Sequence, residues 1–234
     1  APCSRSSIQG SSSFFPRSRH ARCESHRSPF DQGRPLIAIL DYGSGNIRSA
    51  QRACQTTGQE VIVTSNRDEA LSADGLVVPG VGAFAACMKG LRAIRGEEII
   101  RERVNSKRPI LGICVGLQIL FTHSDEDQGQ STGVGIFPTT VKKLNHPVLP
   151  QIGWNTISVA SKSKLFEGIE QERFYFVHSY AATETGIDAG ISTSEYGSTF
   201  IAALETDSIS AVQFHPEKSG EAGLTLLSNW AKTL

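Results

Sequence analysis

The 234-residue sequence predicts a single α/β domain with a central, mostly parallel sheet flanked by helices. Short apolar runs alternate with segments of helical character through residues 36–121, which is typical of repeated strand–helix units. After that, the segments are short, rich in β-forming residues and separated by turns. We therefore expect additional β-strands in the second half that extend or flank the sheet.

The expected strands of the first half are apolar runs, each followed by a turn or a helix. They cover Leu36–Leu40, Glu60–Thr64, Gly75–Val78 and Pro109–Ile113. Helices are expected over Asn46–Thr57, Ala83–Leu91, Glu97–Asn105 and Leu117–Phe121. Glycine-rich turns follow the first and third strands, so the backbone can turn sharply where these strands end.

The second half contributes further strands and one closing helix. The strands are expected over Thr140–Leu144, Thr156–Val159, Phe174–Val177, Thr199–Leu204 and Ile209–Phe214. The helix is expected over Gly220–Leu234.

Residues 1–33 differ from the rest and form a leader that we exclude from the fold, leaving residues 34–234 as the domain. They are rich in Ser and Arg and lack hydrophobic periodicity, and organelle transit peptides have this composition. An appended leader, an unfolded tail or a misassigned start would have the same appearance in the sequence. We expect a cytoplasmic protein, or one in an organelle matrix or stroma if the leader is a transit peptide.

Charge and hydropathy exclude two classes of protein. The whole chain is formally neutral, but residues 1–30 hold five Arg and one acid, a net charge of +4, which leaves −4 for the remainder. This leaves no basic patch for nucleic-acid binding in the predicted domain. No apolar run approaches the roughly 18–20 residues that span a bilayer, so we expect no membrane segment.

The cysteines argue against a disulfide framework and against zinc. There are five of them, an odd number, and no two are spaced as C-x-x-C. They are Cys3, Cys23, Cys54, Cys87 and Cys114. We therefore expect free thiols in a reducing compartment, with no metal and no cofactor.

Cys114 has distinctive neighbours. The segment Gly112–Gly116 lies between a buried strand and a helix and has the G-x-nucleophile-x-G pattern of a nucleophile elbow. The glycines leave room for a strained turn, and the helix N-terminus favours a thiolate. The alternative is a buried cysteine between two glycines. Cys54 and Cys87 lie within predicted helices, where core or surface thiols are expected.

A base and its orienting acid follow 101 residues later. His215-Pro216-Glu217 comes directly after an apolar run, and positions i and i+2 of an extended chain face the same side, so Glu217 can reach His215. Pro216 disfavours helical geometry at His215. A solvated turn is the alternative reading of this tripeptide. Weaker contexts surround the other histidines, His20, His26, His123, His146 and His178.

Taken together, these motifs resemble the class I, triad-type glutamine amidotransferases, which have a flavodoxin-like fold. Further segments resemble the glutaminase subunit of imidazole glycerol phosphate synthase, an enzyme of histidine biosynthesis, from about Leu36 to the C-terminus. These segments are Asp41–Asn46, Pro79–Phe84, Gly153–Asn155, Phe174–Tyr180 and His215–Ser219.

The resemblance implies the roles of the site residues. Cys114 would attack the side-chain amide of L-glutamine, His215 would protonate the leaving ammonia, and Glu217 would orient His215. Water would then cleave the glutamyl thioester. Glutamine contacts and oxyanion donors would come from Gly80, Val81, Gly82, Val115, Gln118, Glu126, His178, Ser179 and Tyr180.

The resemblance also implies a partner, a cyclase subunit that we expect to be a separate polypeptide in a heterodimer. Asn46, Trp154 and Lys218 match its docking face. Each has a simpler alternative: Asn46 as a helix cap, Trp154 as a core residue, and Lys218 as a solvated charge. Trp154 is expected in a loop. The family is poorly active alone and is switched on by the cyclase with its nucleotide ligand; a peptide flip in the Gly80–Gly82 loop is one hypothesis for this.

Competing interpretations fit less well. A dinucleotide site at Gly43-Ser44-Gly45 lacks its third glycine, since Arg48 occupies that place. The glutaminase partner of pyridoxal-phosphate synthase shares the elbow and the His-x-Glu end but lacks the Gly-Trp-Asn and Phe-Val-His-Ser-Tyr segments. A purely regulatory module usually loses the nucleophile or the base. A cysteine peptidase of related fold would not keep both Glu217 and Gln118.

Overall fold

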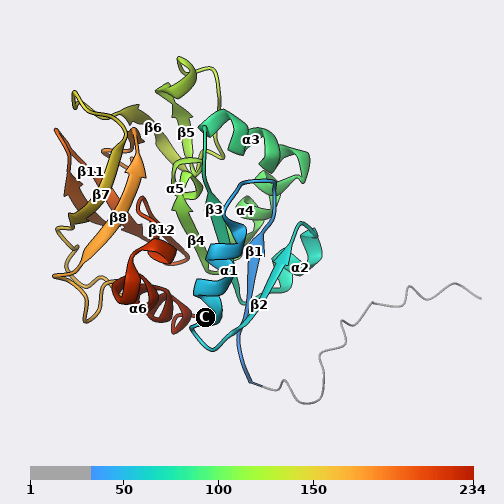
Figure 1. The fold of residues 1–234 in the computed structure, drawn as a ribbon. Helices are drawn as coiled ribbons and strands as arrows, with labels where there is room; N and C mark the ends of the chain where they lie inside the picture. Colours follow the sequence, from blue (N-terminus) through green and yellow to red (C-terminus); the bar gives the residue numbers. More distant parts are fainter. Residues whose placement is uncertain (1–32) are drawn as a thin grey trace, which may run out of the picture. The chain divides into compact units, whose positions relative to one another are not determined.

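A seven-stranded sheet forms the centre of the computed structural model, which describes residues 33–234 (Figure 1). Its strand order is β10-β11-β12-β4-β3-β1-β2. The strands are β1 (Leu36–Leu40), β2 (Glu60–Thr64), β3 (Gly75–Gly80), β4 (Ile110–Cys114), β10 (Gly190–Glu195), β11 (Thr199–Glu205) and β12 (Ile209–Val212). The pairs from β2 to β12 are parallel, and β10 and β11 add an antiparallel edge. The predicted mostly parallel α/β architecture is confirmed.

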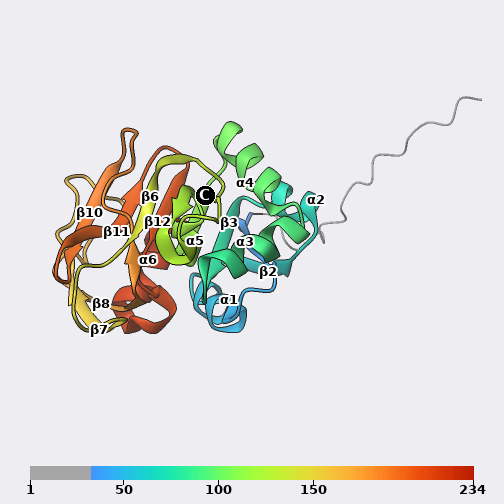
Figure 2. The same cartoon turned by 90° about the horizontal axis from the view of Figure 1, so that it is seen from above.

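Helices cover both faces of this sheet. They are α1 (Ile47–Gln55), α2 (Arg67–Ser72), α3 (Phe84–Ala93), α4 (Gly96–Asn105), α5 (Val115–Gln118) and α6 (Gly220–Ala231). Helix α1 contacts α6, whereas α2 and α3 both contact α4. Figure 2 shows these two groups on opposite sides of the sheet. This arrangement explains why β3 and β4 are buried along their whole length, as their continuous apolar sequences predict.

The additional strands of the second half form two smaller sheets. One has the order β5-β6-β9, made of β5 (Phe121–Ser124), β6 (Phe137–Lys143) and β9 (Tyr180–Ala181). The other is an antiparallel ribbon of β7 (Gln151–Thr156) and β8 (Arg173–His178). Two short 3₁₀ helices complete the fold: η1 (Asp125–Asp127) lies between β5 and β6, and η2 (Pro216–Lys218) lies between β12 and α6. The prediction of extra strands is confirmed.

Several element predictions are wrong in detail. The helix after Cys114 is the single turn α5, not Leu117–Phe121, because Phe121 already opens β5 and pairs with β6. The strand expected over Thr156–Val159 lies earlier, as β7, where Gly153 and Asn155 weaken the local signal and pairing with apolar β8 supplies the stability. Trp154 is therefore on a strand, not in a loop.

Six elements were not predicted from the sequence: α2, β5, β9, β10 and the two 3₁₀ helices. Helix α2 did carry a signal, since the Asn66 side chain caps it by accepting from the backbone N–H groups of Asp68 and Glu69. Residues 1–32 lie outside the described residues, so the leader at residues 1–33 and the domain limits stay predictions.

Candidate active site

Cys114 lies on a strained turn where β4 passes into α5. Its backbone has φ 56° and ψ −112°, a conformation that non-glycine residues rarely adopt. A Cβ on Gly116 would lie 1.8 Å from the Val78 carbonyl oxygen, and one on Gly112 would lie 2.8 Å from the Gly116 carbonyl oxygen. The neighbouring backbones thus approach too closely for any side chain at either glycine. The predicted elbow geometry is confirmed.

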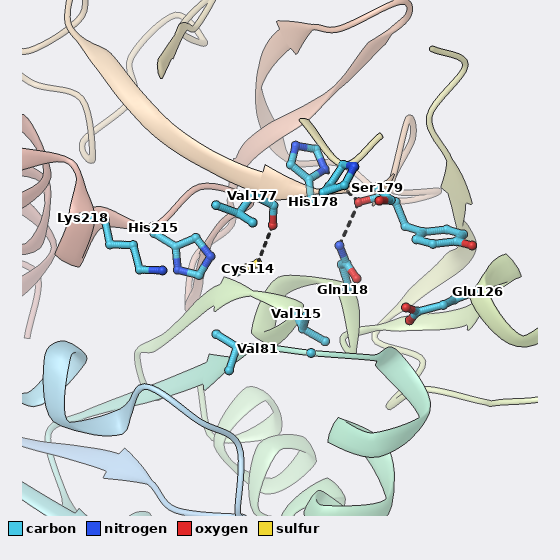
Figure 3. Close-up of a pocket in the computed structure, with 13 residues that line it drawn as sticks. Val81, Cys114, Val115, Gln118, Glu126, Val177, His178, Ser179, His215 and Lys218 are labelled. Atoms are coloured by element: carbon cyan, nitrogen blue, oxygen red, sulfur yellow. Dashed lines mark hydrogen bonds between the residues drawn. The ribbon is translucent and has the colours of Figure 1, made fainter. Parts of the chain in front are cut away.

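The helix that follows is a single turn. Helix α5 has four residues, so few peptide dipoles are aligned behind Cys114. Side-chain and backbone groups also contact the sulfur. The Gln213 amide Nε2 donates to the Cys114 Sγ at 3.8 Å, and the Sγ lies 4.0 Å from the Val177 carbonyl oxygen (Figure 3).

His215 and Glu217 form the predicted pair, but by a different backbone path. The His215 Nδ1 lies 2.9 Å from the Glu217 Oε1, and each side chain is 3% exposed. His215 is extended, with φ −104° and ψ 96°, as Pro216 predicted. Glu217 lies on the 3₁₀ helix η2, so a tight turn, rather than an extended chain, brings the carboxylate back to the imidazole.

The surroundings of His215 favour its protonated form. Burial lowers the pKa of His215, but its interactions with Cys114 and Glu217 outweigh burial and raise that pKa from about 6.5 to about 9. With Nδ1 donating to Glu217, the second ring nitrogen Nε2 is the proton carrier available to the cavity. Figure 3 shows the His215 ring beside Cys114.

A cavity of about 320 Å³ opens in front of Cys114, between the elbow and the end of β8 (Figure 3). Most residues assigned to the site by sequence line it. The lining is Val81, Gly82, Cys114, Val115, Gln118, Glu126, Pro150, Val177, His178, Ser179, Tyr180, His215 and Lys218. Of the remaining predicted site residues, Gly80 lies at the end of β3, paired with Cys114, and Glu217 lies against His215.

Two of these lining residues are already partly engaged. The Gln118 Nε2 donates to the Tyr180 carbonyl oxygen at 2.9 Å and to the Gln213 Oε1 at 3.1 Å, which leaves the Gln118 Oε1 to face a ligand. The Phe84 backbone N–H donates to the Glu126 Oε2 at 2.6 Å, at the start of α3. The remaining oxygen of Glu126 is thus the one that can accept from a ligand.

His178 is neutral and cannot replace His215 as the charged group. Burial lowers the pKa of His178 to about 4. Its Nδ1 lies 3.0 Å from the Tyr180 carbonyl oxygen, so Nδ1 carries the hydrogen in this neutral ring. The buried Nε2 has no hydrogen-bond partner in the described structure.

The glycine loop after β3 is held by a neighbouring loop that the sequence analysis did not include in the site. The Tyr42 hydroxyl and the Ser44 hydroxyl both donate to the Pro79 carbonyl oxygen, the latter at 3.1 Å. A Cβ on Gly80 would lie 2.5 Å from the Gly116 backbone nitrogen, so β3 presses directly against the elbow. Gly82 has φ +91°, which suits glycine.

The three residues assigned to a partner interface occupy different surroundings. Trp154 is 47% exposed on β7, with its ring 5.9 Å from that of Tyr175 in an edge-on contact. Lys218 is exposed on η2 at the cavity. Asn46 is half-buried and makes no side-chain cap on α1; instead its Nδ2 donates to the Glu217 Oε1 at 2.7 Å.

Gln213 is the main residue of the cavity region that the sequence analysis missed. It is fully buried and bridges Gln118 to the Cys114 sulfur. A signal was present, because Gln213 precedes His215 by two residues in extended chain, the same spacing that was used to connect His215 with Glu217.

The other thiols of the described region are buried and free, as expected for core cysteines. They are Cys54 and Cys87. Burial raises the pKa of Cys54 to about 12 and that of Cys87 to about 11, so both are protonated thiols at neutral pH. Within residues 33–234 there is no cluster of three or more metal-ligating side chains. None of the helices in that range is both long enough and apolar enough to cross a membrane.

Comparison with known proteins shows what this chain is similar to. Residues 38–233 match the family model described as glutamine amidotransferase class-I. The imidazole glycerol phosphate synthase subunit HisH of Mycobacterium tuberculosis H37Rv is 55% identical over 201 residues, which cover 85% of this chain and 98% of the relative. The subunit HisH of Nocardia farcinica is 52% identical over 209 residues, covering 86% and 99%.

Solved structures share the fold at lower identity. A putative GMP synthase protein from Thermoplasma acidophilum has a TM-score of 0.67 and 21% identity, covering 86% of this chain and 94% of that one. PurLQS from Thermotoga maritima has a TM-score of 0.64 and 18% identity, covering 86% and 99%.

Proposed function

The chain belongs to the class I glutamine amidotransferase family, among the HisH subunits of imidazole glycerol phosphate synthase, and we propose that Cys114, His215 and Glu217 perform its glutamine hydrolysis. One observation carries this assignment. The buried His215–Glu217 pair, joined at 2.9 Å, lies at the same cavity as the strained Cys114. A nucleophile, a base and an orienting acid are the three parts that such a hydrolysis needs.

The first half-reaction uses the charged state of His215. The Cys114 thiolate attacks the side-chain amide carbon of L-glutamine, which forms a C–S bond and places a negative charge on the amide oxygen. As the C–N bond breaks, the His215 Nε2 gives its proton to the nitrogen, and ammonia leaves. A pKa near 9 keeps this proton on His215 until it is needed.

The second half-reaction reverses the role of His215. Its neutral Nε2 takes a proton from water as the water oxygen attacks the thioester carbon. The C–S bond breaks, glutamate leaves, and the thiolate and imidazolium form again. Glu217 accepts the Nδ1 hydrogen in both steps, so the other ring nitrogen, Nε2, transfers the proton in each.

Two backbone segments supply the oxyanion donors in this proposal. Val115 directly follows the nucleophile, so its N–H is the first donor. The segment Gly80–Gly82 supplies the second, because β3 presses against the elbow and its loop lines the cavity. The Gln118 Oε1, Glu126 and the His178–Tyr180 segment would hold the polar ends of glutamine.

The ammonia is delivered to a separate cyclase subunit in this proposal. The relatives are named as one subunit of a synthase, which implies a second subunit. The face beside the cavity supports docking, since Ile152 and Trp154 lie on β7 with 64% and 47% of their surfaces exposed. Lys218 lies on the same side, at the cavity.

Glutamine turnover with and without the cyclase tests the proposal. The isolated protein should release glutamate slowly, and adding a cyclase subunit with its nucleotide ligand should increase the rate. Cys114→Ser should abolish glutamate release while retaining cyclase binding. Cys54→Ala, which removes a buried thiol from α1, should remain active. A full rate without a partner, or an active Cys114→Ser variant, contradicts the proposal.

A further inference from the structure

Asn46 stands where a helix cap is expected, yet its side chain is used elsewhere. It precedes α1 with φ 68°, in the left-handed region that asparagine tolerates better than most residues. Its carbonyl oxygen accepts from Ser49 and Ala50, so the backbone starts the helix. The side-chain amide turns away, and its Nδ2 donates to the Glu217 Oε1 at 2.7 Å, across 171 residues of sequence.

Glu217 has few other partners. Its Oε1 accepts from both Asn46 and His215, at 2.7 Å and 2.9 Å, while its Oε2 is buried without a hydrogen bond in the described structure. A buried carboxylate needs donors to stay ionised and fixed in place. Asn46 supplies such a donor without adding a charge that would compete with His215.

The remaining neighbours of this carboxylate do not substitute for Asn46. Cys54 lies close enough to Glu217 to interact with it, but burial, and to a smaller extent Glu217, raise the pKa of Cys54 to about 12. Its thiol is therefore neutral. Lys218, next in the chain, is exposed at the cavity and makes no ion pair with Glu217 in the described structure.

The loop that carries Asn46 also touches the oxyanion side of the site. Tyr42 and Ser44 donate to the Pro79 carbonyl oxygen, one residue before Gly80. A Cβ on Gly45 would lie 3.1 Å from the Val81 Cγ2, so the two loops are in close contact. One short segment, residues 42–46, thus touches both the triad carboxylate and the glycine loop.

We propose that Asn46 is a positioning residue for Glu217, and that the loop 42–46 holds the triad carboxylate and the Pro79–Gly82 segment in one arrangement. This inference rests on the proposed function, because it gives Asn46 a task only if Glu217 orients His215. It also separates two roles for Asn46: support of the triad within this chain and contact with a partner.

Two substitutions distinguish the effect of the Asn46 side-chain amide from the effect of its backbone conformation. Asn46→Gly permits the same positive φ and removes the amide. Asn46→Asp keeps the shape but replaces the donor with a second carboxylate facing Glu217. Glutamine hydrolysis is measured in the complex with saturating cyclase and its nucleotide, so that weaker docking is not scored as lost catalysis.

We expect Asn46→Gly to lower kcat about 10-fold or more, with the KM for glutamine within about twofold, since Asn46 does not line the cavity. In Asn46→Asp, one of the two facing carboxyl groups takes up a proton at acidic pH, and this shared proton restores a donor between them. The activity of this variant should therefore recover toward low pH. As pH rises and the shared proton is lost, its activity should fall, and this fall should come at a lower pH than the fall in the wild type. A merely structural role would not move this limb.

Asn66→Gly is the matched control, because Asn66 does cap its helix, α2, away from the cavity. It should lower the thermal unfolding temperature and leave kcat and the pH profile unchanged. If Asn46→Gly changes only the affinity for the cyclase, with kcat at saturation and the pH profile as in the wild type, Asn46 is an interface residue and the inference fails while the proposed function stands. If the wild-type complex hydrolyses no glutamine, both fail.

Discussion

The proposed nucleophile, Cys114, and the proposed base, His215, are held in place in two different ways. Cys114 is fixed by backbone packing, because Gly116 lets α5 approach β3 and Gly112 lets β4 approach α5 without side chains between them. His215 is fixed by hydrogen bonds. Its N–H donates to the Tyr175 carbonyl oxygen at 2.9 Å, and its own carbonyl oxygen accepts from the Ser219 hydroxyl at 2.7 Å.

This difference predicts how substitutions in each half of the site affect stability and activity. A packed backbone has no room for an added atom, so a change at the elbow should lower stability and activity together. A hydrogen-bonded segment can lose its contacts one at a time, so the effect of a substitution around His215 should depend on which hydrogen bond it removes. Substitutions on each side test the contrast directly.

Glu217→Gln should produce the largest change in activity. The Gln amide can present a donor to the Nδ1 of His215 and favour the wrong tautomer, so kcat should fall by about 10²–10⁴-fold. Loss of the carboxylate also removes one of the interactions that raise the pKa of His215 to about 9. Because His215 must be protonated to release ammonia, the alkaline limb of the pH–rate profile should move to lower pH.

Glu221→Gln is the control for this change, since Glu221 is an exposed acid in the first turn of α6. It should leave both kcat and the alkaline limb in place. An unchanged limb in Glu217→Gln would mean that Glu217 does not set the protonation of His215.

Gly116→Ala should break the elbow. The added Cβ would lie 1.8 Å from the Val78 carbonyl oxygen, so β3 and α5 must separate. We expect about 3 kcal/mol less free energy of unfolding, and about 10²-fold less activity from the displaced thiol. Denaturant unfolding and glutamate release measure the two effects.

Gly190→Ala on the edge strand β10 is the matched control, because its Cβ would meet the Glu205 carbonyl oxygen at an ordinary 3.6 Å. Its free energy of unfolding should stay within about 0.5 kcal/mol of the wild type. A stable, active Gly116→Ala variant would overturn the view that close backbone approach fixes Cys114.

Ser219→Ala should have the smallest effect. It removes the hydroxyl that donates to the His215 carbonyl oxygen and accepts from the Tyr175 N–H at 3.0 Å. The buried N–H left without a partner should cost about 1–2 kcal/mol of unfolding free energy, and activity should fall only several-fold. Ser72→Ala, at an exposed hydroxyl, should change neither. A loss of activity in Ser219→Ala as large as that in Glu217→Gln would show that the hydrogen bonds around His215 do not contribute separately.

Much of the fold could be predicted because its signals are local. The strands β1 and β2 are predicted with their observed limits, since runs of β-forming apolar residues between turns specify them. The ribbon strand β7 was misplaced because Gly153 and Asn155 are poor strand formers, and its stability comes from pairing with β8. The single-turn α5 was misjudged because pairing of Phe121 with β6 ends the helix early.

By itself, the sequence determined the backbone constraints around Cys114 and His215. Glycines two residues on either side of Cys114 permit its strained turn, and Pro216 keeps His215 extended, because these effects act between near neighbours in the chain.

Only the tertiary structure decided how the site is supported. Asn46 reaches Glu217 and Gln213 reaches the Cys114 sulfur across separations of 171 and 99 residues. Such contacts leave no local pattern, because the folding of the parallel sheet, rather than spacing along the chain, brings these side chains together. The family resemblance assigned Asn46 to a docking face, and the structure adds that its amide donates to the Glu217 carboxylate.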